Sequence, residues 1–368
     1  MNVSSGKRIW CAVSGHGFGH WSQIVPVLKA LLVEDPELTI HVTGGIPTRL
    51  IANTLHHPFT HDPAQRDVGL IQPNPLRVDL EGTMEALRRL HHDWPARIHQ
   101  ECQTMHAWKA DLILGNIPYL PMEAGTHGGI PTVALTSLSW DEVLLAYAPP
   151  EHPEIAAWVA TMRAAYGQTR LALRITPAMP LHPFGNTLDI PPITTLGINR
   201  RDQLRHDLNI DPRDPRSVVL VTLGGIPADN LPLAALNADR DYLWLVDHPL
   251  QADTASHLHP LEKLSHWLFT DISASVDAVL SKPGYGMTIS TVANRIPFLY
   301  VRRGTFPDEP PITEWAARYG RAAEITPQAF QDGSFTASLA TLLQQNAPPA
   351  PEVNGAEVAA RLLRERFL

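Results

Sequence analysis

Residues 9–20 have the sequence IWCAVSGHGFGH, in which an apolar run is followed by a turn that contains three glycines. The apolar residues 9–13 predict a buried strand, and the helical spacing of the apolar residues over 21–33 predicts an amphipathic helix. A second apolar run at 38–42 predicts another strand. The order strand, glycine turn, helix and strand is typical of the start of a doubly wound parallel sheet.

The alternation of short apolar runs and helical stretches continues, and it restarts after a proline-rich loop at 177–192. We therefore expect two Rossmann-like α/β domains that face a cleft, at 1–195 and 196–350, with a last segment at 351–368. We expect the final helix of that segment, 356–367, to cross back to the first domain. The predicted strands lie at 111–114, 131–135 and 171–175 in the first domain and at 217–223, 242–246, 266–269, 278–280 and 298–301 in the second, and the predicted helices lie at 84–108 with an interruption at Pro95, 140–148, 153–166, 287–294 and 312–319.

The bulk composition excludes several classes of protein. The chain has 368 residues, a two-domain length, and its net charge of −8 without a basic block disfavours nucleic acid as a partner. Its two cysteines, Cys11 and Cys102, provide no disulfide framework and no paired-cysteine metal motif. Because we find no signal peptide and no apolar run near 20 residues, we expect a cytoplasmic protein without a transmembrane segment. Peripheral membrane contact and the oligomeric state stay open.

The first candidate site is the glycine turn itself. Its glycines at 15, 17 and 19 do not have the Gly-x-Gly-x-x-Gly spacing of a dinucleotide fingerprint, and two histidines, His16 and His20, lie between and after them. A histidine at the mouth of a strand is well placed to act as a general base. The alternative is that both histidines only hydrogen-bond the turn.

The second candidate site is the stretch 281–290, SKPGYGMTIS, which follows a predicted buried strand and begins a helix. Backbone amides at such a turn can bind a diphosphate, and Lys282 can add positive charge. The pair Gly224-Gly225 ends another strand on the same edge of the sheet, and two glycine turns at one crevice favour ligand binding. The alternative is a tight strand–helix connection without a ligand.

The third candidate site is the loop 302–310, RRGTFPDEP. Arg302 and Arg303 could clamp phosphates, and the carboxylates, including Glu309, could accept hydrogen bonds from sugar hydroxyls. These residues could equally be solvated loop charges. The histidines of the helical stretch, at 91, 92, 99 and 106, lack metal-ligand spacing, and no serine lies in a Gly-x-Ser-x-Gly motif.

Taken together, the motifs resemble those of the glycosyltransferase-like N-terminal region of plant L-arabinokinase and its stand-alone bacterial relatives, within the glycosyltransferase-B superfamily. More distantly the chain is similar to family 28 glycosyltransferases, with Gly19-His20 and the donor-loop stretch 281–284 as the matching motifs. The resemblance rests on the motifs at 15–20, Ser139-Trp140-Asp141, Gly284-Tyr285-Gly286, Ile296-Pro297-Phe298, Arg302-Arg303, Phe306 and Glu309-Pro310.

The resemblance implies an inverting glycosyltransferase that needs no metal or other cofactor, with a nucleotide diphosphate sugar as co-substrate and an acceptor of unknown identity. It places the donor on the C-terminal domain and the acceptor on the N-terminal domain. Because glycine turns end the parallel strands of both domains, we expect the main pocket between the domains, with His20 and Gly284 on opposing walls. The candidate catalytic residues are His20, His16 and Asp141, and the candidate substrate- or donor-binding residues are Gly17, Gly19, Gly224, Gly225, Lys282, Gly284, Tyr285, Gly286, Ser290, Arg302, Arg303 and Glu309.

One position departs from the family pattern. Ser290 occupies the place where the family usually has a glutamate that holds the ribose hydroxyls. A serine can make one hydrogen bond to a diol where a carboxylate accepts two. A non-catalytic nucleotide- or sugar-binding protein of the same fold is therefore an alternative, and a nucleotide-sugar epimerase of similar architecture is another.

Overall fold

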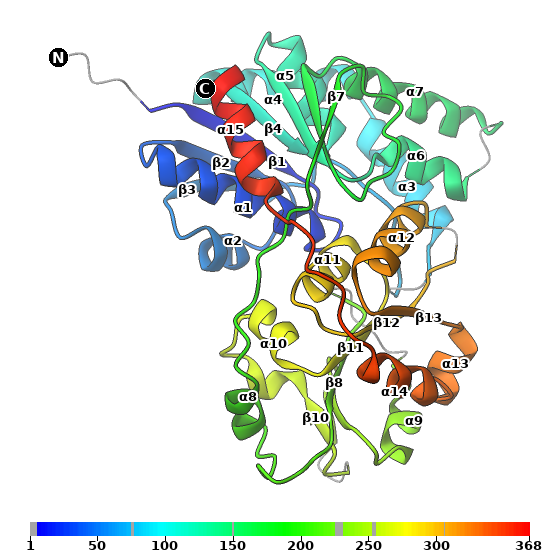
Figure 1. Ribbon diagram of the computed structural model, residues 1–368. Coiled ribbons are helices and arrows are strands. Elements are labelled where there is room, and N and C mark those ends of the chain that lie inside the picture. Colours follow the sequence, from blue (N-terminus) through cyan, green and yellow to red (C-terminus); the bar gives the residue numbers. More distant parts are fainter. Residues whose placement is uncertain (1–5, 75–76, 149–150, 225–230, 252–254, 305) are drawn as a thin grey trace.

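The chain forms two parallel α/β sheets, one above the other in Figure 1, which confirms the predicted fold class. The computed structural model describes residues 6–74, 77–148, 151–224, 231–251, 255–304 and 306–368. Helices lie on both faces of each sheet, as expected for strands that are apolar along their whole length.

The first sheet has seven parallel strands in the order β3-β2-β1-β4-β5-β6-β7. Their bounds are β1 (Arg8–Val13), β2 (Thr39–Thr43), β3 (Phe59–Asp62), β4 (Leu112–Asn116), β5 (Thr132–Thr136), β6 (Leu171–Ile175) and β7 (Thr187–Ile190). The helices of this half are α1 (Gly19–Glu34), α2 (Thr48–Leu55), α3 (Leu80–His91), α4 (Trp94–Trp108), α5 (Tyr119–His127), α6 (Trp140–Tyr147) and α7 (Pro153–Gly167).

The second sheet has six parallel strands in the order β10-β9-β8-β11-β12-β13. Its strands are β8 (Val218–Val221), β9 (Leu243–Val246), β10 (Leu258–Pro260), β11 (Ala278–Ser281), β12 (Phe298–Val301) and β13 (Ala322–Ile325). The helices of this half are α8 (Arg201–Asp207), α9 (Leu233–Ala238), the 3-10 helix η1 (Leu261–Leu264), α10 (Phe269–Ser275), α11 (Tyr285–Ala293), α12 (Glu309–Tyr319), α13 (Pro327–Asp332) and α14 (Thr336–Gln344), and α15 (Gly355–Phe367) ends the chain.

Two local predictions were wrong, and the predicted interruption of the helical stretch 84–108 is present but lies just before Pro95. The strand expected at 266–269 does not form; its apolar residues Leu268 and Phe269 face solvent, with 62% and 43% of their surface exposed, and the edge strand is β10 instead. The proline-rich loop at 177–192 contains strand β7, which pairs with β6 at the edge of the sheet. The helical stretch 84–108 is two helices, and Pro95 lies in the first turn of the second, where a missing N–H costs nothing.

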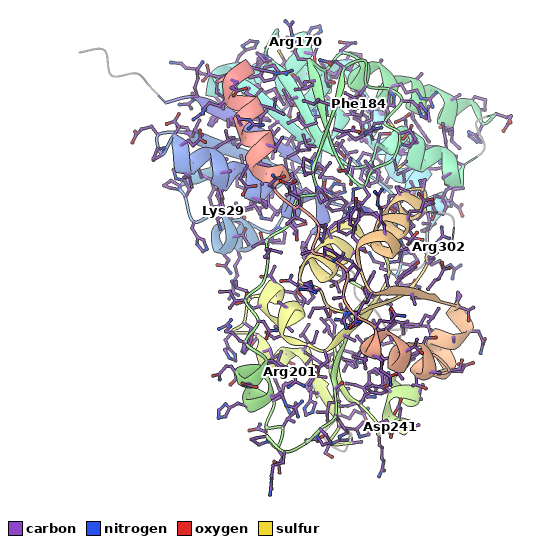
Figure 2. All side chains as sticks on the ribbon, in the orientation of Figure 1. Lys29, Arg170, Phe184, Arg201, Asp241 and Arg302 are labelled. Atoms are coloured by element: carbon purple, nitrogen blue, oxygen red, sulfur yellow. The ribbon has the colours of Figure 1, made fainter. Side chains whose placement is uncertain are left out.

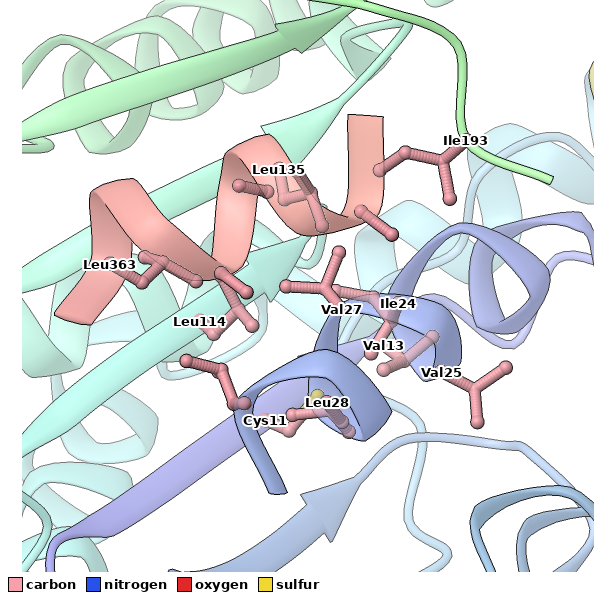
Figure 3. Close-up of a cluster of buried hydrophobic side chains, with 14 of the residues drawn as sticks. Cys11, Val13, Ile24, Val25, Val27, Leu28, Leu114, Leu135, Ile193 and Leu363 are labelled. Atoms are coloured by element: carbon pink, nitrogen blue, oxygen red, sulfur yellow. The ribbon is translucent and has the colours of Figure 1, made fainter. Parts of the chain in front are cut away.

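The final helix crosses from the second half of the chain to the first. Helix α15 packs against α1 and β7, and Ala359, Ala360 and Leu363 belong to the hydrophobic core formed around β1, β2 and α1 (Figure 3). The crossing is held at its start, because the Gly355 N–H donates to the Pro192 carbonyl at 3.1 Å. The last segment of the chain thus completes the core of the first sheet.

None of the helices in the described part of the chain combines the length and the apolar character that a membrane crossing requires.

We predict that Leu363→Ala lowers the free energy of unfolding by about 2–5 kcal/mol, because this fully buried side chain leaves a cavity in the core of the first sheet. Denaturant unfolding of the purified protein measures the change. The control is Arg361→Ala on the exposed side of the same helix, which should stay within about 0.5 kcal/mol of the wild type. Equal effects of the two substitutions would contradict the packing of α15.

Candidate functional site

The first glycine turn lies between β1 and α1, at the carboxyl edge of the first sheet. The Ser14 N–H donates to the Asn116 carbonyl at the end of the neighbouring strand β4, at 2.8 Å. Gly17 has a φ of +76°, a conformation that other residues rarely adopt, and its N–H donates to the Gly15 carbonyl. The turn leaves His16 half-buried and His20 buried in the first turn of α1.

A chain of buried polar side chains orients His20. Its Nδ1 lies 2.7 Å from Oδ1 of Asn116, whose Nδ2 donates to Gln23 at 2.8 Å, and Gln23 Nε2 donates to Ser137 at 3.1 Å. Because the Asn116 amide nitrogen points to Gln23, its oxygen accepts, and Nδ1 of His20 is the donor. Nε2 of His20 makes no hydrogen bond to any described residue and retains its lone pair.

Burial keeps both histidines of the turn uncharged. Desolvation lowers the pKa of His20, and the hydrogen bond to Asn116 opposes this shift. Desolvation lowers the pKa of His16 to about 3, with repulsion from His20, Arg303 and Lys282 in the same direction. Both imidazoles are therefore neutral at pH 7, the state in which a histidine can accept a proton.

Asp67, which was not among the predicted site residues, supports this site. Its carboxylate accepts a hydrogen bond from Trp140 Nε1 at 2.7 Å, and burial raises its pKa to about 6, opposed by hydrogen bonds from Ser14 and Gly15. The Trp140 ring thus held lies 5.2 Å from the ring of His16 and 5.5 Å from that of His20. No motif surrounds Asp67 in the sequence, so only the fold reveals its position.

The second glycine turn lies at the carboxyl edge of the second sheet, after β8 and β11. Cβ atoms built on Gly224 and Gly284 would lie 3.7 and 3.2 Å from Nζ of Lys282, so both glycines leave room for the ammonium group. Gly225 lies outside the described residues.

The amides of this turn differ from the prediction. The N–H of Gly284 donates to the Lys282 carbonyl at 2.8 Å, and that of Gly224 lies 3.2 Å from the Thr222 hydroxyl. Neither amide is free for a ligand. Gly286 is the second residue of α11, and its N–H is one of the first-turn amides that have no partner within the helix. Such amides can bind an anion.

The third cluster is engaged within itself. Arg303 donates to Glu309 from Nε at 2.6 Å and to Asp308 at 2.8 Å, and its guanidinium lies 3.7 Å from the ring centre of Phe306. Nε of Arg302 lies 3.6 Å from the other carboxylate oxygen of Glu309. Arg302 is labelled in Figure 2. The arginines that were expected to bind phosphates are therefore paired with Glu309, the carboxylate that was expected to accept hydrogen bonds from sugar hydroxyls. Glu309 is also fully buried.

Two further predicted residues are buried away from solvent. Asp141, expected near the acceptor, is fully buried and accepts a hydrogen bond from Arg163 of α7 at 2.9 Å. The Ser290 hydroxyl lies 3.4 Å from the Asn294 amide nitrogen one turn later in α11.

The junction between the two halves is packed with side chains. Tyr285, expected to bind the donor, instead belongs to the core around α1, and its hydroxyl accepts from the Ile193 N–H at 3.1 Å and donates to the Thr176 carbonyl at 3.3 Å. Phe306 has 2% of its surface exposed and lies in a second cluster formed otherwise by residues of the first half, including Trp140. Tyr285 and Phe306 thus fill part of the junction beside the glycine turns, while a Cβ on Gly17 or Gly19 would meet no atom within 4 Å.

Two surface hollows lie elsewhere, one of about 320 Å³ at 247–249 and 261–262 and one of about 1090 Å³ at 201–215. They do not mark the expected pocket.

The two glycine turns nevertheless face one another across the junction. Helices α1 and α11 are in contact, and a Cβ on Gly286 would lie 3.3 Å from the Ser22 hydroxyl of α1. Lys282 and Arg303 are close enough to His16 to lower its pKa. The arrangement brings neutral histidines on one wall opposite cations on the other. Within the described residues no group of three or more His, Cys, Asp or Glu could hold a metal ion.

Comparison with known proteins agrees with the predicted resemblance. The chain is 26% identical over 359 residues to the L-arabinokinase of Arabidopsis thaliana, a match that covers 96% of this chain and 34% of that protein. The chain thus spans about a third of the length of this relative. No family model matches the chain.

Solved structures share its fold at low sequence identity. The glycotransferase of kitacinnamycin superimposes with a TM-score of 0.65 at 14% identity and covers 99% of this chain and 100% of its own. A Medicago truncatula protein complexed with UDP-glucose gives 0.58 at 12% identity, covering 98% and 95% of the two chains. MurG of Acinetobacter baumannii gives 0.52 at 14%, covering 98% and 99%. The chain therefore has the glycosyltransferase-B fold, as the resemblance implied.

We predict that Tyr285→Phe lowers the free energy of unfolding by about 1–3 kcal/mol, because it leaves the buried Ile193 N–H without an acceptor. Denaturant unfolding measures this loss. Tyr319→Phe, at a half-buried tyrosine at the end of α12, is the control and should be nearly neutral. An unchanged stability of Tyr285→Phe would return Tyr285 to the candidate ligand-binding residues.

We predict that Asn116→Asp raises the pKa of His20, because a carboxylate 2.7 Å from Nδ1 stabilises the imidazolium that the neutral amide does not. An NMR titration of the His20 ring should move to higher pH. Ser137→Ala, at the far end of the same hydrogen-bond chain, adds no charge and should leave the midpoint nearly unchanged. A midpoint that does not move in Asn116→Asp would show that the two side chains are not paired in solution.

Proposed function

We propose that the protein transfers a glycosyl group from a nucleotide diphosphate sugar to a hydroxyl acceptor, with inversion at the anomeric carbon. One observation carries the proposal: a neutral His20, whose Nε2 bonds no described residue, lies on one wall of the junction, and the glycine turn with Lys282 lies on the other. The glycosyltransferase-B fold supports a nucleotide sugar as the donor, and one structural relative is complexed with UDP-glucose.

In this reaction His20 is the general base. The acceptor hydroxyl donates to Nε2, and the proton moves to His20 as the hydroxyl oxygen attacks the anomeric carbon. The Nδ1–H remains on the Asn116 oxygen, which holds the imidazole in the tautomer that can accept. Since His16 lies against the same Trp140, we propose that it lines the acceptor side.

The diphosphate is the leaving group on the opposite wall. The Gly286 amide in the first turn of α11 and the ammonium of Lys282 stabilise the charge that grows on it as the glycosidic bond breaks. In this proposal these groups carry the charge without a metal ion. A base and a leaving group on opposite walls favour attack from the face opposite the departing diphosphate, which inverts the anomeric centre.

A non-catalytic binding protein is the second candidate, and two observations favour it. Ser290 replaces the usual ribose-binding glutamate, and its hydroxyl lies against Asn294. Arg303 and Glu309, which could have contacted a donor, are paired with one another. Such a protein would bind a nucleotide or a sugar without transfer.

Thermal shift against nucleoside diphosphates and nucleotide sugars tests both candidates. A ligand at 100 times its dissociation constant should stabilise the protein by about 2.7 kcal/mol. Release of the diphosphate from a stabilising nucleotide sugar, with a panel of hydroxyl acceptors, then separates the two candidates. A donor that binds and never reacts favours the binding protein, and the absence of any stabilising nucleotide contradicts both.

We predict that His20→Ala lowers turnover by about 10²–10⁴-fold and leaves diphosphate affinity nearly unchanged, because the base acts on the acceptor and the other wall holds the donor. Turnover assays measure the rate, and isothermal titration measures the diphosphate affinity. His57→Ala, at a histidine of the same half that bonds the Leu38 carbonyl, is the control for general damage. Full activity in His20→Ala would remove it as the base.

The converse variant acts on the donor wall. A valine at Gly284 would meet Nζ of Lys282, since a Cβ there lies 3.2 Å from it, and it should weaken diphosphate binding. His20→Ala and Gly284→Val thus separate a loss of chemistry from a loss of donor binding.

A further inference from the structure

Lys282 is an unusual lysine, because its side chain lies in a cradle without a partner of its own. It follows β11 directly and points between the glycine positions Gly224 and Gly284. Its side chain makes no hydrogen bond and no ion pair within 4 Å to any residue in the described ranges. A lysine ammonium can donate three hydrogen bonds, so this group has unused capacity.

The charged and titratable groups around Lys282 come from both halves of the chain. His16 faces it from the turn before α1, Arg303 from the loop after β12, and Asp308 and Glu309 from the start of α12. Both carboxylates are already in contact with Arg303, at 2.8 and 2.6 Å, and Arg302 lies 3.6 Å from Glu309. The two negative charges of Asp308 and Glu309 are therefore already balanced by the two positive charges of Arg302 and Arg303, without Lys282.

The positive charge of Lys282 is consequently not neutralised in the free protein. Removal of water and repulsion from Arg303 lower its pKa to about 7, and attraction to Asp308 and Glu309 only partly opposes this. At neutral pH the free side chain is then about half protonated.

We propose that Lys282 is a proton-linked anion sensor, which takes a proton from solvent when a diphosphate enters the turn and is fully charged only while the site is occupied. This inference rests on the proposed function, since it assumes a diphosphate as the ligand. The neutral amine plus one solvent proton gives the ammonium, and no other bond changes.

The linkage would matter for the reaction as well as for binding. A diphosphate ester gains negative charge as its glycosidic bond breaks, so a group whose proton is held more firmly by that growing charge favours the transition state over the ground state. Because Lys282 is partly uncharged while the site is empty, it also repels Arg303 less, and Arg303 is already held by Asp308 and Glu309.

Isothermal titration with UDP and with inorganic pyrophosphate, in HEPES and in Tris at the same pH, measures the protons taken up on binding. With the free pKa at about 7, uptake should be about 0.9 proton at pH 8 and about 0.1 at pH 6. At pH 8 the phosphate groups, whose second pKa is about 6, contribute little. The affinity of the wild type should fall up to about tenfold per pH unit above pH 7.

Three variants locate the proton. Lys282→Met should bind more weakly at pH 6 and take up almost no proton at pH 8. Lys282→Arg carries a permanent charge and should bind without uptake and with little change in affinity between pH 6 and pH 9. Lys263→Met, at an exposed lysine of the same half, should behave as the wild type.

The outcomes separate this inference from the function beneath it. Diphosphate binding with less than about 0.3 proton taken up at pH 8, or full uptake that survives in Lys282→Met, overturns the inference and leaves the proposed donor site intact. Failure of both UDP and pyrophosphate to bind the wild type overturns both. Should Lys282→Arg not fold, the comparison of the wild type with Lys282→Met decides.

Discussion

The burial of side chains from the second half of the chain in the cores of the first fixes how the two sheets face one another. Tyr285 and Ile312 lie in the core around α1, and Phe306 lies in the cluster around Trp140. Helix α15 closes the same core from the other direction. Because these contacts lie beside the glycine turns, they hold the carboxyl edges of the two sheets opposite each other, and every later feature of the site depends on that placement.

The same close packing sets the charges at the junction. Burial penalises an unpaired charge, and the two walls of the junction answer this penalty differently. The histidines are neutral, Arg303 is held by Asp308 and Glu309, and Lys282 has glycines around it in place of a partner. Charged histidines would repel Lys282 and Arg303 across the junction, so their neutrality is compatible with the proposed base and the proposed anion site lying together.

The sequence predicts most of the architecture and only part of the site. The period of apolar residues and the glycines after strands reveal both sheets, since these features depend on local geometry. They cannot reveal that the amides of Gly284 and Gly224 donate to the Lys282 carbonyl and the Thr222 hydroxyl. Nor can they reveal that Trp140 donates to Asp67, which lies 73 positions away in the sequence. The strand expected at 266–269 failed for a related reason: an apolar run does not show which way its side chains face, and Leu268 and Phe269 face solvent.

The missing ribose carboxylate has a structural consequence for how a donor can be recognised. Glu309 is a carboxylate near Lys282, but it is fully buried in the first turn of α12 and bonded to Arg303. Its release would break a buried ion pair and leave Arg303 with Asp308 alone, whereas a hydrogen bond to a sugar hydroxyl returns only about 0.5–1.5 kcal/mol. In the proposed donor site, recognition of the nucleoside would therefore fall to main-chain groups and to short side chains such as Ser290. In the donor site proposed above, the diphosphate would meet the first turn of α11 and Lys282 and would carry the larger share of the donor affinity. The glycines that keep space open around Lys282 would then matter more than any single residue that contacts the ribose.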